Sequence, residues 1–193
     1  VIHRTGWSWS ALCADLDNDG WKDLFFSNVY MRDITNKDFI SYRKKRIRFS
    51  SKQTQDSLYF SLMTSLPTVK LRNQLFKNRG DLTFENLTDG WSDFDASLSN
   101  GAVIADFDLD GDLDILTSEI NAVAALYENR HAANHANSNN YLKIQLRGDP
   151  LNPTGIGTKV SIYHQDKHQY QEYYGVRGYY SSSIGPIHFG LGA

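Results

Sequence analysis

The sequence predicts an all-β protein whose short strands are interrupted by one mainly helical insertion. Short apolar runs of strand type flank each of two acidic loops, and residues 141–193 alternate apolar with polar residues between frequent glycines. Residues 29–70 differ from both, because they hold few turn residues and place apolar side chains near helical spacing. With 193 residues, 40% of them hydrophobic, the chain can form the core of one large or two small domains.

The composition argues against several classes of protein. A formal net charge of −2 argues against a nucleic-acid partner, and no apolar run approaches the length of a membrane span. No signal peptide is visible, but the chain does not begin with methionine, so we expect it to be part of a longer protein. The single cysteine, Cys13, cannot form an intrachain disulfide, and its apolar surroundings predict a buried thiol.

Short strands are predicted on both sides of the insertion. Residues 6–28 predict a strand, an acidic loop and a second strand. Residues 71–130 return to short strands, and "RGD" at 79–81 lies between two of them. We interpret this tripeptide as a hairpin turn rather than an integrin ligand, because Gly80 can supply the positive φ that a turn needs. Residues 131–140 are small and polar, which predicts a linker.

The insertion, residues 29–70, predicts two helical pieces. Thr35 and Asn36 are candidate N-caps for the first piece. The second piece ends at Pro67, because proline disfavours helical backbone in the residue before it. The basic run 42–48 is interpreted as a solvated helix end, with docking on an acidic partner or a membrane surface as the alternative.

Residues 141–193 predict a small β module. Apolar residues alternate with polar ones in "YLKIQL" and "KVSIY", which gives each run one apolar face. The run "QYQEYYGVRGYYSSS" is rich in aromatic residues that favour strands.

The two acidic loops share the pattern D-x-D-x-D-G-x-x-D, at 15–23 and 106–114. Alternate carboxylates converge, the glycine allows a sharp turn and position 7 offers a backbone carbonyl, all of which suits a calcium ion. Without a cation, carboxylates held this close would repel one another. The alternative is a solvated acidic turn. The sequence therefore predicts two structural calcium ions with the ligand residues Asp15, Asp17, Asp19, Trp21, Asp23, Asp106, Asp108, Asp110, Asp112 and Asp114.

The loops do not fit an EF-hand. That motif needs a glutamate at position 12 between two helices, whereas position 12 is Phe26 in one copy and Thr117 in the other, and the flanks are of strand type. The copies begin 91 residues apart, and without the insertion this distance approaches one four-stranded propeller blade of roughly 40–50 residues. The spacing therefore predicts stacked repeat units.

Other side chains suggest binding functions. The pairs His131/His135 and His164/His168 have a spacing that could bind zinc on a helix, but we interpret them as solvated histidines. The aromatic fraction of 13% is interpreted mainly as core packing, with stacking on sugars as the alternative. Because Trp21 would bind calcium only through its backbone, we expect its side chain to point outward as a candidate contact residue.

The motifs of the first part resemble FG-GAP or VCBS repeats. Each acidic loop is followed by L-[FY]-x-N, at Leu75–Asn78 and Leu126–Asn129, and the first copy adds a G-D-x-T-F hairpin at Gly80–Phe84. This resemblance implies calcium-bearing blades of an integrin-α-like β-propeller, with the remaining blades upstream in a longer chain.

The C-terminal stretch 141–193 resembles the ASPIC/UnbV domain. It carries N-x-x-G-I-G-x-x-V at Asn152–Val160, G-Y-x-S-S at Gly178–Ser182 and F-G-L-G at Phe189–Gly192. The pairing of both modules resembles cartilage-acidic-protein/UnbV-like proteins, in particular long members from Bacteroidota that are often associated with glycan uptake at the outer membrane.

The resemblance implies an exported protein of the periplasm or cell surface, without catalytic residues, that binds a glycan or protein partner or acts as an adhesion or scaffold module. Two alternatives stay open. One is an accessory subunit of an outer-membrane transport or secretion complex, with the basic insertion as its docking surface. The other is a glycan-active enzyme on a propeller fold, although the insertion holds no histidine or glutamate for acid–base chemistry.

Overall fold

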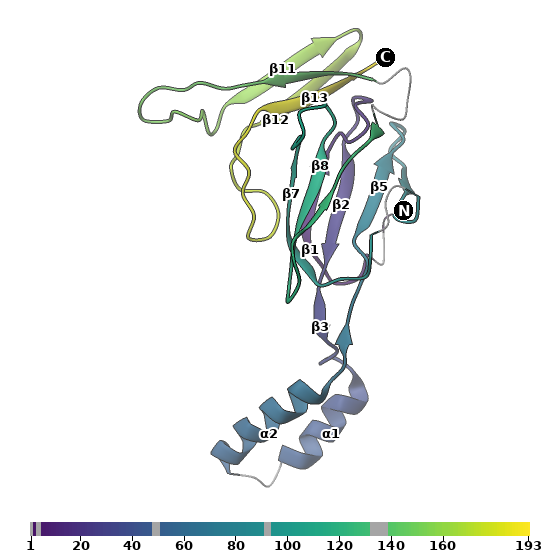
Figure 1. Cartoon of the computed structure of the whole chain (residues 1–193), viewed down its shortest axis with the longest axis vertical. Coiled ribbons are helices and arrows are strands. Elements are labelled where there is room, and N and C mark those ends of the chain that lie inside the picture. The colour runs from purple at the N-terminus through teal and green to yellow at the C-terminus, as the bar shows by residue number, and fades with distance from the viewer. Residues whose placement is uncertain (1, 3–4, 48–50, 91–93, 132–138) are drawn as a thin grey trace.

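A computed structural model describes residues 2, 5–47, 51–90, 94–131 and 139–193. Strands far outnumber helices within these ranges, which confirms the predicted all-β class. The strands form two larger sheets and a C-terminal module, and the two helices project at the far end (Figure 1).

The first sheet is antiparallel and has the order β1-β2-β5-β6. Its strands are β1 (Ser8–Ala14), β2 (Asp23–Asn28), β5 (Gln74–Asn78) and β6 (Phe84–Asn86). The predicted hairpin turn joins the last two strands, with Gly80 at φ 74°. The helical insertion therefore enters between β2 and β5 without interrupting their pairing.

The second sheet repeats the start of the first. It consists of β7 (Ser99–Ala105), β8 (Asp114–Glu119) and β9 (Ala125–Tyr127), paired antiparallel in this order. Its first two strands, like β1 and β2, are joined by an acidic loop. In both pairs the last aspartate of the loop lies opposite the alanine that precedes the loop, and the register shifts near the other end.

The core lies between the two sheets. Leu12, Phe25 and Leu75 are neighbours across three strands of the first sheet, and each is at most 6% exposed. Ile115 of the second sheet, fully buried, packs in the same cluster. Phe94 lies between the sheets, because its ring centroid is 5.8 Å from that of Phe25 and 4.7 Å from that of Tyr127.

Cys13 corrects one prediction, because its thiol is exposed rather than buried. Successive side chains of a strand point to opposite faces, and Leu12 and Ala14 occupy the face of β1 that packs on the core. Cys13 therefore points away from the second sheet.

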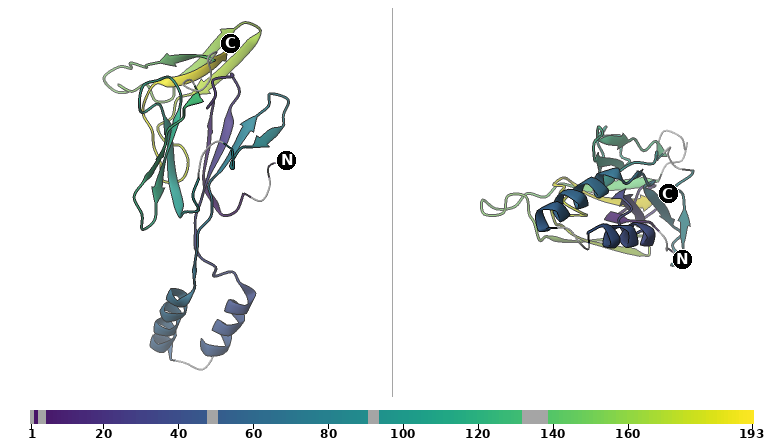
Figure 2. Two further views of the ribbon diagram at one scale, coloured as in Figure 1. Left: turned by 45° about the vertical axis from the view of Figure 1, so that its right-hand side comes forward. Right: turned by 90° about the horizontal axis from the view of Figure 1, so that it is seen from below.

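The insertion forms a helical hairpin on a two-stranded stalk, and Figures 1 and 2 show it projecting from the sheets at the end opposite the C-terminal module. The stalk is β3 (Tyr30–Arg32) paired with β4 (Thr68–Val69), and the helices are α1 (Lys37–Ile47) and α2 (Lys52–Ser65). Neither helix is long and apolar enough to cross a membrane, as far as the described residues show.

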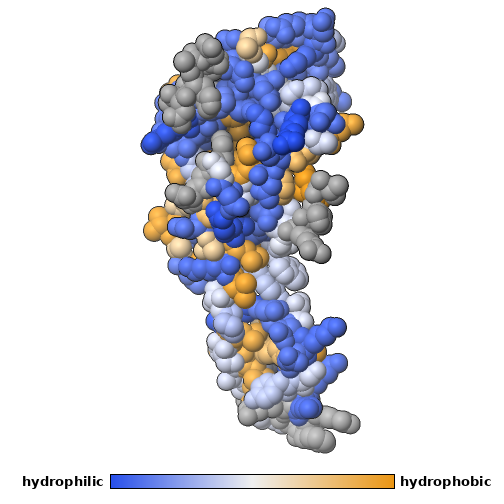
Figure 3. All heavy atoms as spheres, turned by 90° about the vertical axis from the view of Figure 1, so that its right-hand side faces the viewer, coloured by the Kyte–Doolittle hydropathy of each residue, from blue (hydrophilic) through white to orange (hydrophobic). Residues whose placement is uncertain are grey.

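The ends of these helices follow from local sequence. Asn36 caps α1, because its side-chain oxygen accepts hydrogen bonds from the backbone N–H groups of Asp38 (2.9 Å) and Phe39 (3.2 Å). Helix α2 ends just before Pro67, as predicted, and the Arg32 guanidinium donates to the carbonyl oxygen of Thr64 at 2.8 Å. Figure 3 shows apolar surface on the hairpin. The rings of Tyr42, Tyr59 and Phe60 on the two helices are exposed.

The C-terminal module contains two strand pairs. β10 (Asn140–Ile144) pairs with β13 (Ile187–Gly192), and β11 (Lys159–His164) pairs with β12 (Lys167–Glu172). The apolar faces that the sequence predicts meet in a small core of Tyr173, Ile187 and Phe189, against which Ile144, Leu146, Val160 and Ile162 pack. The predicted linker lies mostly outside the described residues.

Only the start of the aromatic run 169–183 lies in a strand, β12, although the rest of its residues also favour one. The strand ends at Glu172, and residues 173–186 form a long excursion that returns to β13. Glycines at 175, 178 and 185 and Pro186 interrupt any regular pairing there, and the structure has one isolated bridge between Val176 and Ser182.

Candidate metal centre

Both acidic loops lie at the end of the sheets that faces the C-terminal module (Figure 1). Each loop starts directly after a strand that packs in the core, so the carboxylate of its first aspartate lies close to the interior. The negative charge of the first loop is therefore largely buried, where solvent screening is weak, whereas Asp108 and Asp110 of the second loop are exposed.

In the first loop one carboxylate oxygen from each of Asp15, Asp17 and Asp19 lies within 4.8 Å of the others. The turn that brings them together is closed by Asp15, which accepts hydrogen bonds from the backbone N–H groups of Asp19 at 3.1 Å and Gly20 at 2.8 Å. Gly20 has φ 91°, a value that side chains disfavour, so glycine at position 6 is required by the backbone itself.

The second loop converges differently. Its three clustered carboxylates are those of Asp106, Asp108 and Asp114, whose oxygens again lie within 4.8 Å of one another. Asp110 stands outside this cluster and accepts a hydrogen bond from the backbone N–H of Asp112 at 2.9 Å. The pattern of the sequence is thus the same in both loops, whereas the oxygens that meet are not.

The aspartates at position 9 of the loops bind backbone N–H groups, a role that the sequence pattern did not indicate. Asp23 accepts hydrogen bonds from the backbone N–H groups of Leu16 at 3.0 Å and Asn78 at 2.9 Å. Asp114 does the same with Phe107 at 2.9 Å and Asn129 at 2.7 Å. Each of these carboxylates therefore fastens the loop to the strand or segment that follows in its own repeat.

The asparagines of the two L-[FY]-x-N motifs complete these links. The Asn78 amide donates to the carbonyl oxygen of Lys22 at 3.1 Å. The Asn129 amide donates to Leu113 in its own repeat at 3.2 Å, and to Leu16 in the first loop at 2.6 Å. Asn129 is 3% exposed, so this buried amide ties the two repeats together.

The residues at position 7 differ between the copies. Trp21 is 43% exposed, and its indole packs on the turn at Gly80 with the Lys167 ammonium 5.6 Å from the ring centroid. Asp112 is fully buried and accepts a hydrogen bond at 3.2 Å from the side-chain amide of Asn18. Neither side chain belongs to a carboxylate cluster, so any contribution of these residues to a cation would come from the backbone.

The pKa values of the loop acids reflect their burial. Burial raises the pKa of Asp15 to about 7 against the hydrogen bond from Gly20, and the charges of Asp19 and Asp17 raise it further. Burial also raises the pKa of Asp23 to about 7. The pKa values of Asp19, Asp110 and Asp114 are raised, with burial as the first cause in each.

Two lysines supply part of the missing positive charge. The Lys77 ammonium contacts the Asp17 carboxylate and lies 3.8 Å from that of Asp19. Lys143, from the C-terminal module, contacts Asp106. Burial raises the pKa of Asp106, but the hydrogen bond and charge of Lys143 outweigh it, so the pKa is lowered overall. Two groups of hard carboxylate oxygens with incomplete compensation fit a divalent cation such as calcium.

The C-terminal module packs directly on the first loop through Asn18. The side-chain oxygen of Asn18 lies 2.6 Å from Nε2 of His188, and its backbone carbonyl accepts a hydrogen bond from Gly192 at 2.8 Å. Its side-chain amide donates to the carbonyl oxygen of Gly111 at 3.3 Å. Burial lowers the pKa of His188 to about 4, which keeps this imidazole neutral near pH 7.

Two glycines make this approach possible. A Cβ atom on Gly190 would lie 2.1 Å from a carboxylate oxygen of Asp15 and 2.6 Å from the backbone of Asn18. A Cβ atom on Gly111 would lie 2.1 Å from the ring of Tyr141. Backbone at these positions therefore touches its neighbours without room for a side chain.

The other candidate sites are not assembled. His164 and His168 flank the turn between β11 and β12, and His168 stacks on Tyr163 with ring centroids 4.6 Å apart. His135 lies outside the described residues. Across the ranges that the structure describes, the two candidate metal clusters contain only aspartates.

Comparison with known families supports one part of the sequence interpretation. The family model described as ASPIC and UnbV matches residues 148–193, which confirms the resemblance of the C-terminal module. The comparison with curated proteins gives no match. The match covers β13 with the F-G-L-G motif, whose Gly190 lies against the first acidic loop, but not β10.

Replacement of Gly190 by alanine tests this interface. We expect Gly190→Ala to lower the free energy of unfolding by about 1–3 kcal/mol, because the added methyl group forces backbone and carboxylate apart. Urea denaturation followed by tryptophan fluorescence measures the change. Gly185→Ala is the matched control, since a Cβ there meets nothing within 4 Å. Equal stability of both variants would contradict the packing of β13 on the first loop.

Proposed function

We propose that the chain is a calcium-stabilised, noncatalytic binding or scaffold module of an exported or cell-surface protein. The convergence of three carboxylate oxygens within 4.8 Å in each of two loops of one pattern carries this proposal. Calcium held by Asp15, Asp17 and Asp19 in the first loop, and by Asp106, Asp108 and Asp114 in the second, would neutralise charge at the contact with the C-terminal module.

We further propose that the two sheets are blades of an integrin-α-like propeller. Their repeated strand–loop–strand start and the links from position 9 to the L-[FY]-x-N asparagine support this assignment. The outer face of the first sheet carries exposed Ala11 and half-buried Leu24 and Phe26, as a face that packs on a further blade would. Blades upstream in a longer protein are the partner proposed for this face.

Recognition of a glycan or protein at the cell surface is proposed for the aromatic residues near the start of β1. Trp7 is 48% exposed and stacks on Tyr30 with ring centroids 4.5 Å apart, and Trp9 is 45% exposed and meets Tyr179 edge to face. Half-exposed rings that neighbouring rings hold in place suit stacking on sugars or on apolar side chains. Localisation outside the cytoplasm rests on the family resemblance alone.

The projecting helical hairpin favours a second candidate function, that of an accessory subunit of an outer-membrane transport or secretion complex. Helix α1 carries Arg43, Lys44 and Lys45, and the nearby exposed rings of Tyr42 and Tyr59 add apolar contact area. Co-purification from native membranes, with and without the hairpin, distinguishes this role from recognition through Trp7.

Removal of calcium should destabilise the protein. We expect the thermal midpoint to fall in chelator and to recover with added calcium, because at about a hundredfold over its Kd each ion contributes about 2.7 kcal/mol of binding linkage. Asp15→Asn and Asp106→Asn should each reduce the number of bound calcium ions from two to one, as measured by elemental analysis. Asp166→Asn, at an exposed turn position, is the control. A thermal midpoint unchanged by the chelator, with no calcium bound, would refute the proposal.

The stabilisation by calcium should shrink on acidification. In the folded, calcium-free protein Asp15 and Asp23 have pKa values of about 7, against 3.8 as the ordinary value. These two carboxyls therefore favour the calcium-free fold at low pH and lose this contribution as pH rises through about 7. Calcium has to displace the proton of its ligand Asp15 and also favours the charged form of nearby Asp23, so the shift of the thermal midpoint on adding calcium to metal-free buffer should be larger at pH 7.5 than at pH 5.5. A shift that is the same at both values would contradict the raised pKa values.

Trp7→Ala should weaken partner binding without unfolding the chain. We expect about a tenfold loss of affinity for a glycan or protein identified by array or pull-down, because a stacking ring contributes about 1 kcal/mol or more to binding. Tyr163→Ala removes a ring that is 79% exposed in the C-terminal module and serves as the control. Unchanged affinity of the Trp7 variant, at an unchanged thermal midpoint, would place the binding surface elsewhere.

A further inference from the structure

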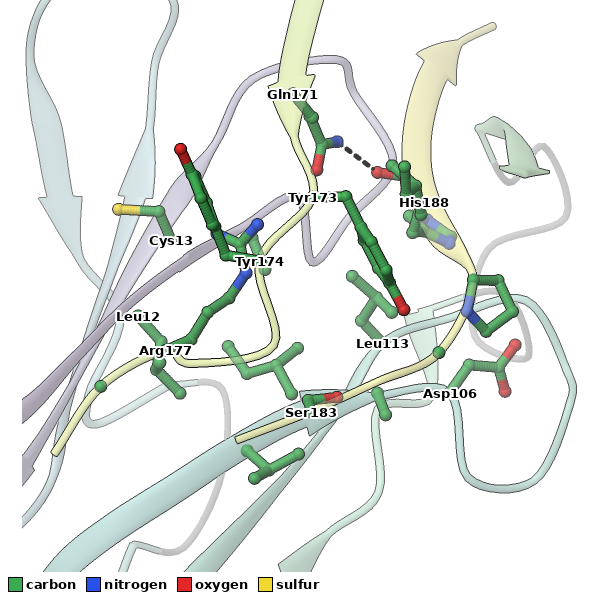
Figure 4. Close-up of a pocket in the computed structure, with 18 of the residues that line it drawn as sticks. Leu12, Cys13, Asp106, Leu113, Gln171, Tyr173, Tyr174, Arg177, Ser183 and His188 are labelled. Atoms are coloured by element: carbon green, nitrogen blue, oxygen red, sulfur yellow. Dashed lines mark hydrogen bonds between the residues drawn. The ribbon is translucent and has the colours of Figure 1, made fainter. Parts of the chain in front are cut away.

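A cavity of about 500 Å³ lies where the C-terminal module meets the two sheets (Figure 4). Leu12 of β1 and Ile104 of β7 line it from the sheets, and Tyr173 and Ile187 line it from the module. Its size falls within the range of small-molecule sites, and its position between separately folded parts is typical of them. The cavity is separate from the carboxylate clusters except that Asp106 contributes to its rim.

One wall of the cavity is the excursion 173–186, which is fastened to both sheets. The backbone N–H of Tyr179 donates to the Ser10 hydroxyl of β1 at 2.9 Å. The Ser181 hydroxyl accepts from the backbone N–H of Ala102 of β7 at 3.1 Å. Gly178 allows the close approach, because a Cβ there would lie 2.8 Å from the Ser10 hydroxyl oxygen. The wall is therefore built by specific hydrogen bonds and preformed.

The charges that line the cavity do not balance. Of its two acids, Asp106 pairs with Lys143, and Glu172 accepts a hydrogen bond from the Tyr174 hydroxyl. Arg177 donates to the backbone carbonyl of Glu172 at 3.0 Å. Within the described part of the chain, neither Arg177 nor Lys22 lies within ion-pair distance of a carboxylate. The charges of Asp15 and Asp23 still attract the Lys22 ammonium over a longer distance.

The two cations and the apolar wall occur together in one cavity. Figure 4 shows Arg177 beside Tyr174, with Tyr173 and Leu113 across from them. Lys22 is half-buried and Arg177 is exposed, and neither has a carboxylate partner at ion-pair distance, so both can form charge-assisted hydrogen bonds to an anion in the cavity. An inorganic anion would leave the apolar side chains of Leu12, Ile104 and Leu113 without an apolar contact.

We propose that this cavity binds a small organic carboxylate with an apolar body. Its carboxylate group pairs with Lys22 and Arg177, and its body packs against Leu12, Ile104 and Tyr173. The site depends on contact between the C-terminal module and the sheets, since both contribute to its lining. It does not require that calcium occupy the acidic loops.

Calorimetric titration with phenylbutyrate and its neutral analogue phenylbutanol tests the proposal on the unmodified protein, in calcium-containing and in calcium-free buffer. We expect the acid to bind one site, and to bind at least about tenfold more tightly than the alcohol, because a charged hydrogen bond contributes about 1.5–3 kcal/mol. Binding of both compounds with equal affinity, or no binding of the acid at millimolar concentration, would overturn the proposal whatever the calcium result.

Variants locate the site. Lys22→Met and Arg177→Met should each weaken the binding of phenylbutyrate about tenfold and leave that of phenylbutanol unchanged. Lys159→Met, which removes an exposed cation of β11, should bind phenylbutyrate like the unmodified protein. Arg177→Lys, which keeps the charge, should retain more affinity than Arg177→Met. Loss of affinity for both compounds, or equal affinity in all variants, would exclude recognition of the carboxylate by these cations.

Discussion

The two acidic loops lie at the end of the sheets that faces the C-terminal module, and the negative charge of each carboxylate cluster has to be compensated there. Asp23 and Asp114 are satisfied by backbone N–H groups, whereas Asp17 and Asp106 contact lysines. Burial first, and then the charges of Asp19 and Asp17, raise the pKa of Asp15 to about 7. Like charges held in a poorly solvated space repel, so the arrangement of strands around the loops depends on these partners and, in our proposal, on calcium.

The C-terminal module takes part in this compensation. Lys143 reaches Asp106 from β10, His188 meets Asn18, and the backbone at Gly190 lies against Asp15. The module and the loops therefore share one interface. The same contact creates the cavity between the sheets and residues 173–186, so the proposed carboxylate site and the proposed calcium sites depend on one interface through different side chains.

The helical hairpin is structurally independent of this interface. It enters between β2 and β5 on the short stalk of β3 and β4, and those two main strands still pair directly through Phe25 and Leu75. Because the sheet closes behind it, the hairpin can carry exposed basic and aromatic residues without a cost to the core. The hairpin thus lies at the end of the molecule opposite the proposed calcium sites and the cavity (Figures 1 and 2).

Features that depend on neighbours along the chain could be predicted from the sequence. Strand alternation, the turn at Gly80, the cap at Asn36 and the end of α2 before Pro67 follow from local backbone preferences, and the D-x-D-x-D-G-x-x-D pattern identified both loops. Packing between the sheets sets which face of β1 is buried, and hence that Cys13 is exposed. It is also through tertiary contacts that position 9 binds backbone amides, that the β-prone run after Glu172 leaves the sheet to fasten onto β1 and β7, and that a cavity forms there. Those outcomes depend on contacts between residues far apart in sequence, for which local propensity carries no information.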